Sequence, residues 1–370
     1  MFIAYCLLLI QEGISIKVDL FYKENKPTLG VDIGATSIKV VQLKKSGHNT
    51  KLVGYGNMGL PGGCVSEGII YDPETVAKYI KKLLEEPKYG KFKAKRVNSA
   101  IPESYIFTRV LELPEMTYDD MEQAITWDAE QYIPIALSDL YIDFEVLGPA
   151  LSAKEGYNDV ALVAAPRAIV DSYMKMFDLL NLEVGILETN LSSIARAVVS
   201  QKEINETIVL ADIGGERTNM AIFDRAIRVT GSLPRGGVDF TRAIAEKCKI
   251  NILEAEETKN QDGLPAKNGK VKEAMEPILL EIVRDIKKII NYYEEKSGNK
   301  KNLVSKIIIC GGNASIPGLM EYLQKAIDLR TIMGNPWANI SIYPLKPVPK
   351  LEAPMYTAAI GLALKGSIHA

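Results

Sequence analysis

Two short acidic turns are the part of this sequence best suited to chemistry. Asp32–Gly34 and Asp212–Gly214 both read Asp-Ile-Gly, and each lies between two apolar runs, which predicts a strand, a turn and a second strand. Glycine lets backbone N–H groups approach an anion closely, and a carboxylate at a strand end can hold Mg²⁺ directly or through water. Each turn therefore suits the binding of a phosphate chain and its cation, although one such turn alone is weak evidence.

The two turns belong to an internal repeat. Leu29–Ala35 (LGVDIGA) matches Val209–Gly215 (VLADIGG) at an offset of 212 − 32 = 180 residues. A duplicated hairpin indicates two similar lobes with a cleft between them, in which facing hairpins would hold a triphosphate from both sides. The pair is therefore much stronger evidence than either copy, and it predicts Asp32 and Asp212 as the ligands of one magnesium ion.

A third glycine-rich element follows an apolar strand late in the chain. Ile307–Gly318 reads IIICGGNASIPG, so that Gly311 and Gly312 remove side chains between the strand and the helix predicted after them. Such an opening admits a flat ring or a ribose against the backbone. A tight strand-to-helix turn without a ligand is the alternative interpretation.

The composition is that of a globular chain large enough for two lobes. Its 370 residues are 47% hydrophobic and 24% charged. Lys+Arg 44 against Asp+Glu 46 gives a net charge of −2, which argues against nucleic-acid binding. The only histidines are His48 and His369, and the four cysteines never have C-x-x-C spacing, which argues against a histidine base or a zinc site. Predicted strands alternate with helices throughout, which indicates an α/β fold.

The combined elements resemble the superfamily of actin, the DnaK-type chaperones and FtsA, over about residues 26–366. Within it, five stretches resemble the PilM family of type IV pilus assembly. They are Leu29–Val41, Phe107–Pro114, Met121–Pro134, Asp212–Phe223 and Leu233–Phe240. The resemblance implies an α/β, actin-like ATPase fold with two duplicated lobes around a nucleotide cleft, an inserted subdomain of the FtsA/PilM type, and ATP with Mg²⁺ as cofactors.

The resemblance also assigns roles to particular residues. Glu188 corresponds to a connector carboxylate that orients water or metal, although an acid favoured by a helix dipole is the alternative. Lys39 corresponds to a lysine that reaches a phosphate, with a solvated strand lysine as the alternative. The nucleotide contacts implied in this way are Asp32, Gly34, Ala35, Thr36, Ser37, Lys39, Asp212, Gly214, Gly215, Glu216, Arg217, Thr218, Gly236, Gly237, Gly311, Gly312 and Asn313.

The expected organisation has two lobes and two terminal pieces. Residues 1–25 are expected to form a poorly defined extension, because the apolar start lacks a basic flank and a cleavage site and is too short to span a bilayer. The remaining boundaries are a first lobe at 26–188 with its core at 26–95 and the inserted subdomain at 96–188, a second lobe at 189–352 with a helical subdomain at about 232–303, and a C-terminal helix at 353–370 that returns to the first lobe.

The resemblance implies a role in assembly. In the PilM family a cleft beside the inserted subdomain receives the short N-terminal cytoplasmic peptide of PilN, an inner-membrane protein. We therefore expect a cytoplasmic protein of the type IV pilus platform, or of a related type II secretion or competence system. It would be peripheral to the inner membrane through a PilN-like partner. Whether it also contacts other platform proteins and ATPases stays open.

Two departures limit this expectation. Gly215 and Asn219 stand where relatives carry further acids, so we expect at most slow ATP hydrolysis. The end of the sequence, Lys365–Ala370, lacks the membrane-binding amphipathic helix of FtsA-like proteins, so no direct membrane insertion is expected. Three alternatives stay open: an FtsA-like cell-division protein, a nucleotide-independent scaffold, and a small-molecule kinase, for which we find no third acid in the sequence.

Overall fold

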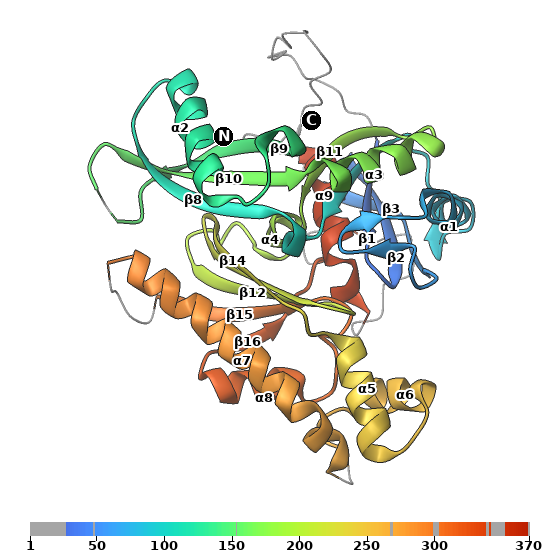
Figure 1. The fold of residues 1–370 in the computed structure, drawn as a ribbon. Helices are drawn as coiled ribbons and strands as arrows, with labels where there is room; N and C mark the ends of the chain where they lie inside the picture. Colours follow the sequence, from blue (N-terminus) through green and yellow to red (C-terminus); the bar gives the residue numbers. More distant parts are fainter. Residues whose placement is uncertain are drawn as a thin grey trace.

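The computed structural model describes residues 27–46, 49–152, 154–266, 269–298, 303–337, 340–341 and 352–368. The extension predicted at 1–25 lies outside these residues. Two sheets with helices around them form the two lobes, and a third, smaller sheet stands beside them (Figure 1). Among the described residues, no helix combines the length and the apolar character that crossing a membrane requires.

The first lobe is built on a mixed sheet with the order β11-β7-β1-β2-β3-β17. β1 pairs antiparallel with β2 and parallel with β7, and the short β6 pairs with β3. A two-stranded hairpin, β4–β5, lies outside the sheet. The bounds of these strands are β1 Thr28–Ile33, β2 Ser37–Ser46, β3 Asn49–Gly59, β4 Val65–Ser66, β5 Ile69–Ile70, β6 Tyr89–Gly90, β7 Arg96–Ile101, β11 Glu183–Thr189 and β17 Ile340–Ser341.

The second lobe repeats the centre of this sheet. Its order is β14-β13-β12-β15-β16, with β12 antiparallel to β13 and parallel to β15. Asp32 faces Lys39 across the first hairpin, and Asp212 faces Asn219 at the same place in the second. The predicted duplication is therefore present in strand order and register. The strands are β12 Thr207–Ile213, β13 Thr218–Asp224, β14 Ala226–Leu233, β15 Val304–Cys310 and β16 Thr331–Met333.

Helices cover the first sheet on both faces. α1 begins at an Asp72 cap, whose carboxylate accepts from the Thr75 N–H, with Pro73 in the first turn. α1 and α3 pack in one core with β1 and β7, while α9 packs in another with β2 and β3. α4 crosses α9 so closely that a Cβ on Gly361 would lie 1.8 Å from the Ser193 carbonyl oxygen. These helices are α1 Pro73–Glu85, α3 Arg167–Leu179, α4 Asn190–Val198 and α9 Thr357–Ile368, with a 3₁₀ turn η3 at Ala353–Tyr356 before α9.

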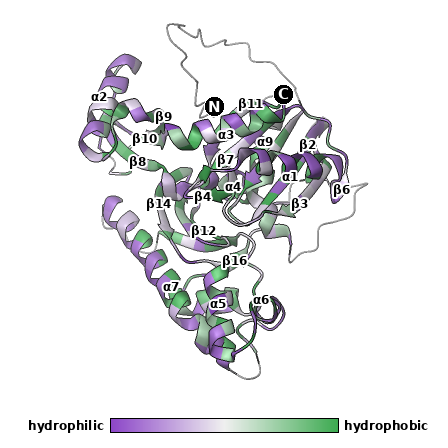
Figure 2. Ribbon diagram, turned by 45° about the vertical axis from the view of Figure 1, so that its right-hand side comes forward, coloured by the Kyte–Doolittle hydropathy of each residue, from purple (hydrophilic) through white to green (hydrophobic). Residues whose placement is uncertain are grey.

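The helices of the second lobe share a core with one face of its sheet, while α4 packs against residues of the same strands in another cluster. Side chains of β12, β13 and β15 share a buried cluster with α5, α7 and α8. Figure 2 shows hydrophilic and hydrophobic residues mixed along α7, as expected for a helix with one buried face. The helices are α5 Gly237–Cys248, α6 Ile252–Gln261, α7 Lys270–Lys296 and α8 Leu319–Ile327.

The inserted subdomain is smaller than the sequence predicts. Its sheet has the order β8-β10-β9 and shares a core with α2. The predicted bounds 96–188 are too wide, because β7 and β11 pair within the first sheet and α3 packs into the first-lobe core. The second lobe also ends before 352, since β17 pairs with β3. The elements are a 3₁₀ turn η1 Glu103–Tyr105, β8 Phe107–Pro114, α2 Tyr118–Tyr132, a 3₁₀ turn η2 Leu137–Asp139, β9 Leu140–Pro149 and β10 Tyr157–Pro166.

Candidate nucleotide-binding cleft

The two acidic hairpins face each other across a cavity between the lobes. A Cβ built on Gly215 would lie 3.1 Å from Thr36 Oγ1 and 4.0 Å from Thr36 Cβ, so the tips of the hairpins are in contact distance. Each tip is closed in the same way, by hydrogen bonds from Gly34 N to the Ser37 carbonyl (3.0 Å) and from Gly214 N to the Arg217 carbonyl (2.8 Å). The cavity has a volume of about 490 Å³, within the range of small-molecule sites.

Two carboxylates and one lysine meet at the floor of this cavity. Lys39 Nζ lies 3.4 Å from Asp32 Oδ2, and Asn190 donates to Asp212 Oδ2 at 2.9 Å. Burial, and then the charge of Asp32, raise the pKa of Asp212 to about 6, against the opposing effects of Lys39 and Asn190. Because two carboxylates face only one lysine, the floor of the cavity favours the binding of a further cation.

The donor set fits Mg²⁺ bound together with phosphates. Within the described part of the chain, no group of three or more histidine, cysteine, aspartate or glutamate side chains forms a ready-made metal site. Mg²⁺ usually takes only one or two protein carboxylates and completes its shell with phosphate oxygens and water. Asp32 and Asp212 would hold the ion in that way, with neutralisation of the phosphate charge as its contribution.

The third glycine-rich loop closes the cavity above Asp212. Gly311 has φ +89°, and a Cβ there would lie 2.5 Å from Asp212 Oδ1, so that only glycine fits. Asn313 ties the loop to the second hairpin, because its Nδ2 donates to the Gly214 carbonyl (2.8 Å) and its backbone N–H to the Ile213 carbonyl (3.1 Å). Gly237 packs against the Asn313 amide group from the other side.

Most of the residues predicted as nucleotide contacts line this cavity. Those that do are Asp32, Gly34, Ala35, Thr36, Ser37, Lys39, Asp212, Gly214, Gly215, Glu216, Arg217, Gly237, Gly311, Gly312 and Asn313. Thr218 does not: its side chain is buried and donates to the Arg235 carbonyl. Gly236 packs behind the hairpin, where a Cβ would lie 2.6 Å from the Gly215 carbonyl oxygen. Both support the second hairpin instead of facing the cavity.

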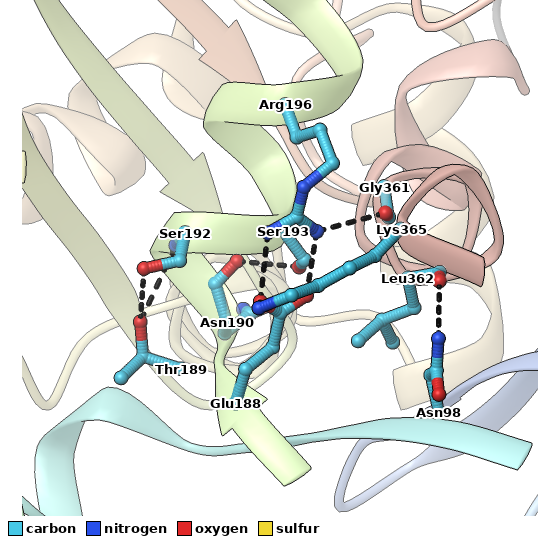
Figure 3. Close-up of polar contacts among 10 residues, drawn as sticks. All are labelled: Asn98, Glu188, Thr189, Asn190, Ser192, Ser193, Arg196, Gly361, Leu362 and Lys365. Carbon is cyan, nitrogen blue, oxygen red and sulfur yellow. Dashed lines mark hydrogen bonds and ion pairs between the residues drawn. The ribbon is translucent and has the colours of Figure 1, made fainter. Parts of the chain in front are cut away.

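Glu188, predicted to orient water or metal, is also outside the cavity lining. Its carboxylate accepts two hydrogen bonds from Arg196 (2.6 and 2.8 Å) and one from Lys365 (3.1 Å), as Figure 3 shows. Burial would raise the pKa of Glu188, but Arg196 and Lys365 together lower it below its usual value. Arg196 also donates to the Gly361 carbonyl (2.9 Å). This carboxylate therefore joins β11, α4 and α9, and its oxygens are occupied by cations.

Several cavity residues were not predicted from the sequence. α6 contributes Glu256, Lys259 and Asn260, and the end of β11 is followed by Asn190, whose buried Oδ1 has no hydrogen-bond partner. Lys259 is 2% exposed and donates to Glu256 Oε2 (2.7 Å) and to Thr241 Oγ1 (3.1 Å). The available signal was the spacing of Glu256, Lys259 and Asn260, which puts all three on one face of a helix.

A buried acid lies where the inserted subdomain leaves the first lobe. Glu103 is 5% exposed, its Oε1 accepts from Thr108 Oγ1 (3.1 Å), and its Oε2 has no hydrogen-bond partner of normal geometry. Burial raises the pKa of Glu103 to about 7, although Thr108, Thr189 and the Leu191 N–H oppose the increase. Glu103 therefore keeps its proton to a higher pH than an exposed glutamate does.

This acid predicts a pH-dependent stability. Because the folded pKa of about 7 is above the ordinary value of 4.5, the folded state binds more protons between these pH values, and stability is lost as pH rises through that window. Glu103→Gln should therefore gain stability relative to the wild type between pH 5 and pH 8, by up to about 3 kcal/mol. Urea denaturation at each pH measures the free energy of unfolding, and Glu115→Gln, at an exposed position, is the control. A constant difference between Glu103→Gln and the wild type would contradict the prediction.

Sequence comparisons relate the chain to one protein family and to several known proteins. The model of the family described as type IV pilus assembly protein PilM matches residues 30–367. Cell division protein FtsA of Streptococcus pneumoniae is 24% identical over 339 residues, covering 81% of this chain and 74% of that protein. FtsA of Enterococcus hirae is 24% identical over 380 residues, covering 90% and 81%.

Solved structures show the same fold. The PilM–PilN type IV pilus biogenesis complex superposes with a TM-score of 0.79 at 26% identity, covering 93% of this chain and 99% of that one. MreB5 of Spiroplasma citri bound to AMPPNP gives a TM-score of 0.55 at 13% identity, covering 92% and 96%, which shows a shared actin-like fold. With the matched family model spanning both lobes, the chain belongs to the type IV pilus assembly protein PilM family.

Proposed function

We propose that this chain is an ATP-binding scaffold of the type IV pilus assembly platform, or of a related type II secretion or competence system. The observation that carries the proposal is the contact distance between the two hairpin tips across a cavity floored by Asp32 and Asp212. Calorimetric titration of the full chain with Mg²⁺·ATP tests it. Saturable binding at one site is expected, and no heat at millimolar ATP would contradict it.

The cavity suggests how the nucleotide lies. The phosphates would lie in the cavity that both hairpin tips line, and the contact between Thr36 and Gly215 would open to admit them. Lys39 would reach one phosphate, and backbone N–H groups of both tips would face the phosphate oxygens. The adenosine would lie between the Gly311–Asn313 loop and α6. There Glu256 is placed to accept a hydrogen bond from a ribose hydroxyl, whereas the three donors of Lys259 already serve the Gly237 carbonyl, Thr241 and Glu256.

The ribose contact gives a prediction for Glu256. The wild type should bind ATP more tightly than 2′-deoxy-ATP, by about tenfold, because a hydrogen bond to a charged group is lost. Glu256→Gln should narrow the difference between the two affinities, because a neutral amide oxygen accepts a weaker hydrogen bond than a carboxylate does, with little change for 2′-deoxy-ATP, as measured by competition calorimetry. Glu257→Gln, on the same helix but outside the cavity lining, is the control. An unchanged ATP preference in Glu256→Gln would contradict the ribose contact.

Hydrolysis should be slow at best. The side chain beside Asp212 is an amide, Asn190, which cannot take a proton from an attacking water. Glu188 cannot take this role, because its oxygens are held by Arg196 and Lys365. Turnover far below the typical enzyme value of about 10 s⁻¹ is expected.

The proposed partner is a PilN-like inner-membrane protein with a short cytoplasmic N-terminal peptide. The similarity to the PilM–PilN complex supports this partner. Through this partner we place the chain at the cytoplasmic face of the inner membrane.

The proposed partner gives a prediction of its own. A synthetic peptide of the partner's cytoplasmic N-terminus should bind the full chain with an affinity on the order of 1 μM, measured by fluorescence anisotropy. A peptide of the same composition in scrambled order is the control. No binding at high protein concentration would contradict the proposed partner.

A further inference from the structure

The inserted subdomain touches the second lobe as well as the first. Asp159 on β10 accepts from Arg228 Nη1 on β14 at 2.8 Å, with side chains only 7% and 2% exposed. This ion pair joins the inserted subdomain to the second lobe. Leu151, from the same end of the subdomain, packs against the second-lobe core. Figure 1 shows the small sheet lying above β14.

Both partners of the ion pair are held firmly on their own side. Asp159 sits at a β-bulge, and its Oδ2 also accepts from the Leu151 N–H (3.1 Å). Arg228 is fixed on the second lobe, because its Nε donates to the Asp224 carbonyl (3.1 Å) while Asp224 Oδ2 accepts from Tyr293 on α7 (2.8 Å). A movement of the second lobe would therefore pull on β10 directly.

The rest of this interface is partly open. A cavity of about 750 Å³ is lined by β8, β14 and α7, and near the other end of the interface Arg217 Nε donates to the Tyr105 hydroxyl at 3.3 Å. The pair itself is costly to bury: burial raises the pKa of Asp159 and lowers that of Arg228 although they face each other. Because this contact is small and polar, and burial is unfavourable for both charges, it can be broken without unfolding the inserted subdomain or the second lobe.

We propose that Asp159 and Arg228 form a latch that couples the angle between the lobes to the position of the inserted subdomain. Closure of the two lobes around a ligand is a rigid-body rotation, and a subdomain connected to both lobes must follow it or detach. With the latch closed, the subdomain moves with the second lobe and shifts against the first lobe. The regulatory use of this motion rests on the proposed function, whereas the mechanical link does not.

Distances between spin labels test the latch in the full chain. The exposed positions Lys81 on α1, Glu130 on α2 and Lys287 on α7 are changed to cysteine in pairs, in a Cys6→Ser, Cys248→Ser background. Without nucleotide, double electron–electron resonance should give a narrow distance distribution between spin labels at residues 130 and 287. Arg228→Glu, which faces Asp159 with a like charge, should broaden it, and the swap Asp159→Arg with Arg228→Glu should restore it. Equal widths in all three proteins would overturn the proposal.

A milder variant separates the latch from a folding defect. Asp159→Asn with Arg228→Gln removes both charges and leaves no buried ion unpaired. On addition of Mg²⁺·AMPPNP, the wild type should change both the 81–287 and the 81–130 distances, whereas this variant should change only the first. Identical 81–130 changes in both would overturn the proposal. If AMPPNP changes none of the label-to-label distances, the proposed nucleotide function fails. The widths of the 130–287 distance distributions measured without nucleotide still decide whether the latch exists.

Lys247→Met is the matched control. It removes an ion pair with Glu273 that lies wholly within the second lobe. Its distance distributions should equal those of the wild type with and without nucleotide. A control variant that behaved like Arg228→Glu would overturn the proposal, because the loss of any ion pair would then have the same effect.

Discussion

Asp212→Asn should weaken the binding of Mg²⁺·ATP at least a hundredfold, about 2.7 kcal/mol, without destabilising the free protein. The loss is expected because Asn lacks the charge that would hold the cation beside Asp32. The free protein should keep or gain stability, because burial and Asp32 already disfavour the ionised form of Asp212. Calorimetry measures the affinity, and thermal unfolding measures the stability.

Measuring the ATP affinity and the unfolding temperature together makes this prediction specific. A general folding defect would lower the unfolding temperature and the affinity in parallel. Asp119→Asn, in the exposed first turn of α2, is the control and should leave both unchanged. Wild-type affinity in Asp212→Asn would exclude Asp212 as a magnesium ligand and leave a nucleotide-independent scaffold as the better account.

Glu188→Gln should destabilise the fold by about 3 kcal/mol, because it removes the carboxylate charge that half-buried Arg196 and buried Lys365 share. Since Lys365 is on α9 and Arg196 on α4, the loss affects the junction of both helices with the first sheet. ATP affinity per folded molecule should change little, because Glu188 does not line the cleft. Urea denaturation and calorimetry below the transition measure the two effects.

This experiment separates the two roles considered for Glu188. A water-orienting carboxylate would, on removal, slow phosphate release and leave stability nearly intact. Glu206→Gln, which removes a partly exposed partner of Lys306, is the control and should cost under about 1 kcal/mol. A stable Glu188→Gln protein with slower hydrolysis would restore the catalytic role that the sequence suggested.

The hairpins could be predicted from the sequence because their chemistry is local. Asp-Ile-Gly between apolar runs specifies strand, turn and strand within a few residues, and its repetition specifies a second copy of the same unit. The Gly311–Asn313 loop was found in the same way. Each needed only backbone freedom at glycine and a neighbouring strand.

Features set by tertiary pairing could not be predicted in this way. Arg96–Ile101 and Glu183–Thr189 are ordinary short strands in the sequence, and only their parallel pairing places them in the first sheet rather than in the insertion. Glu188 lies on β11 and Asn190 starts α4, so the change from strand to helix between them decides which side chain reaches the cleft. No rule of strand alternation extends across that boundary.

A disulfide between the two hairpin tips tests the central claim most directly. The built Cβ of Gly215 lies 4.0 Å from Thr36 Cβ, a separation that suits a disulfide, so Thr36→Cys with Gly215→Cys should cross-link on mild oxidation in the Cys6→Ser, Cys248→Ser background. Mg²⁺·ATP added first should slow the reaction at least tenfold, and the cross-linked protein should no longer bind ATP. Cross-linking that ignores ATP, in a protein that binds ATP equally well afterwards, would contradict a phosphate site between the hairpins.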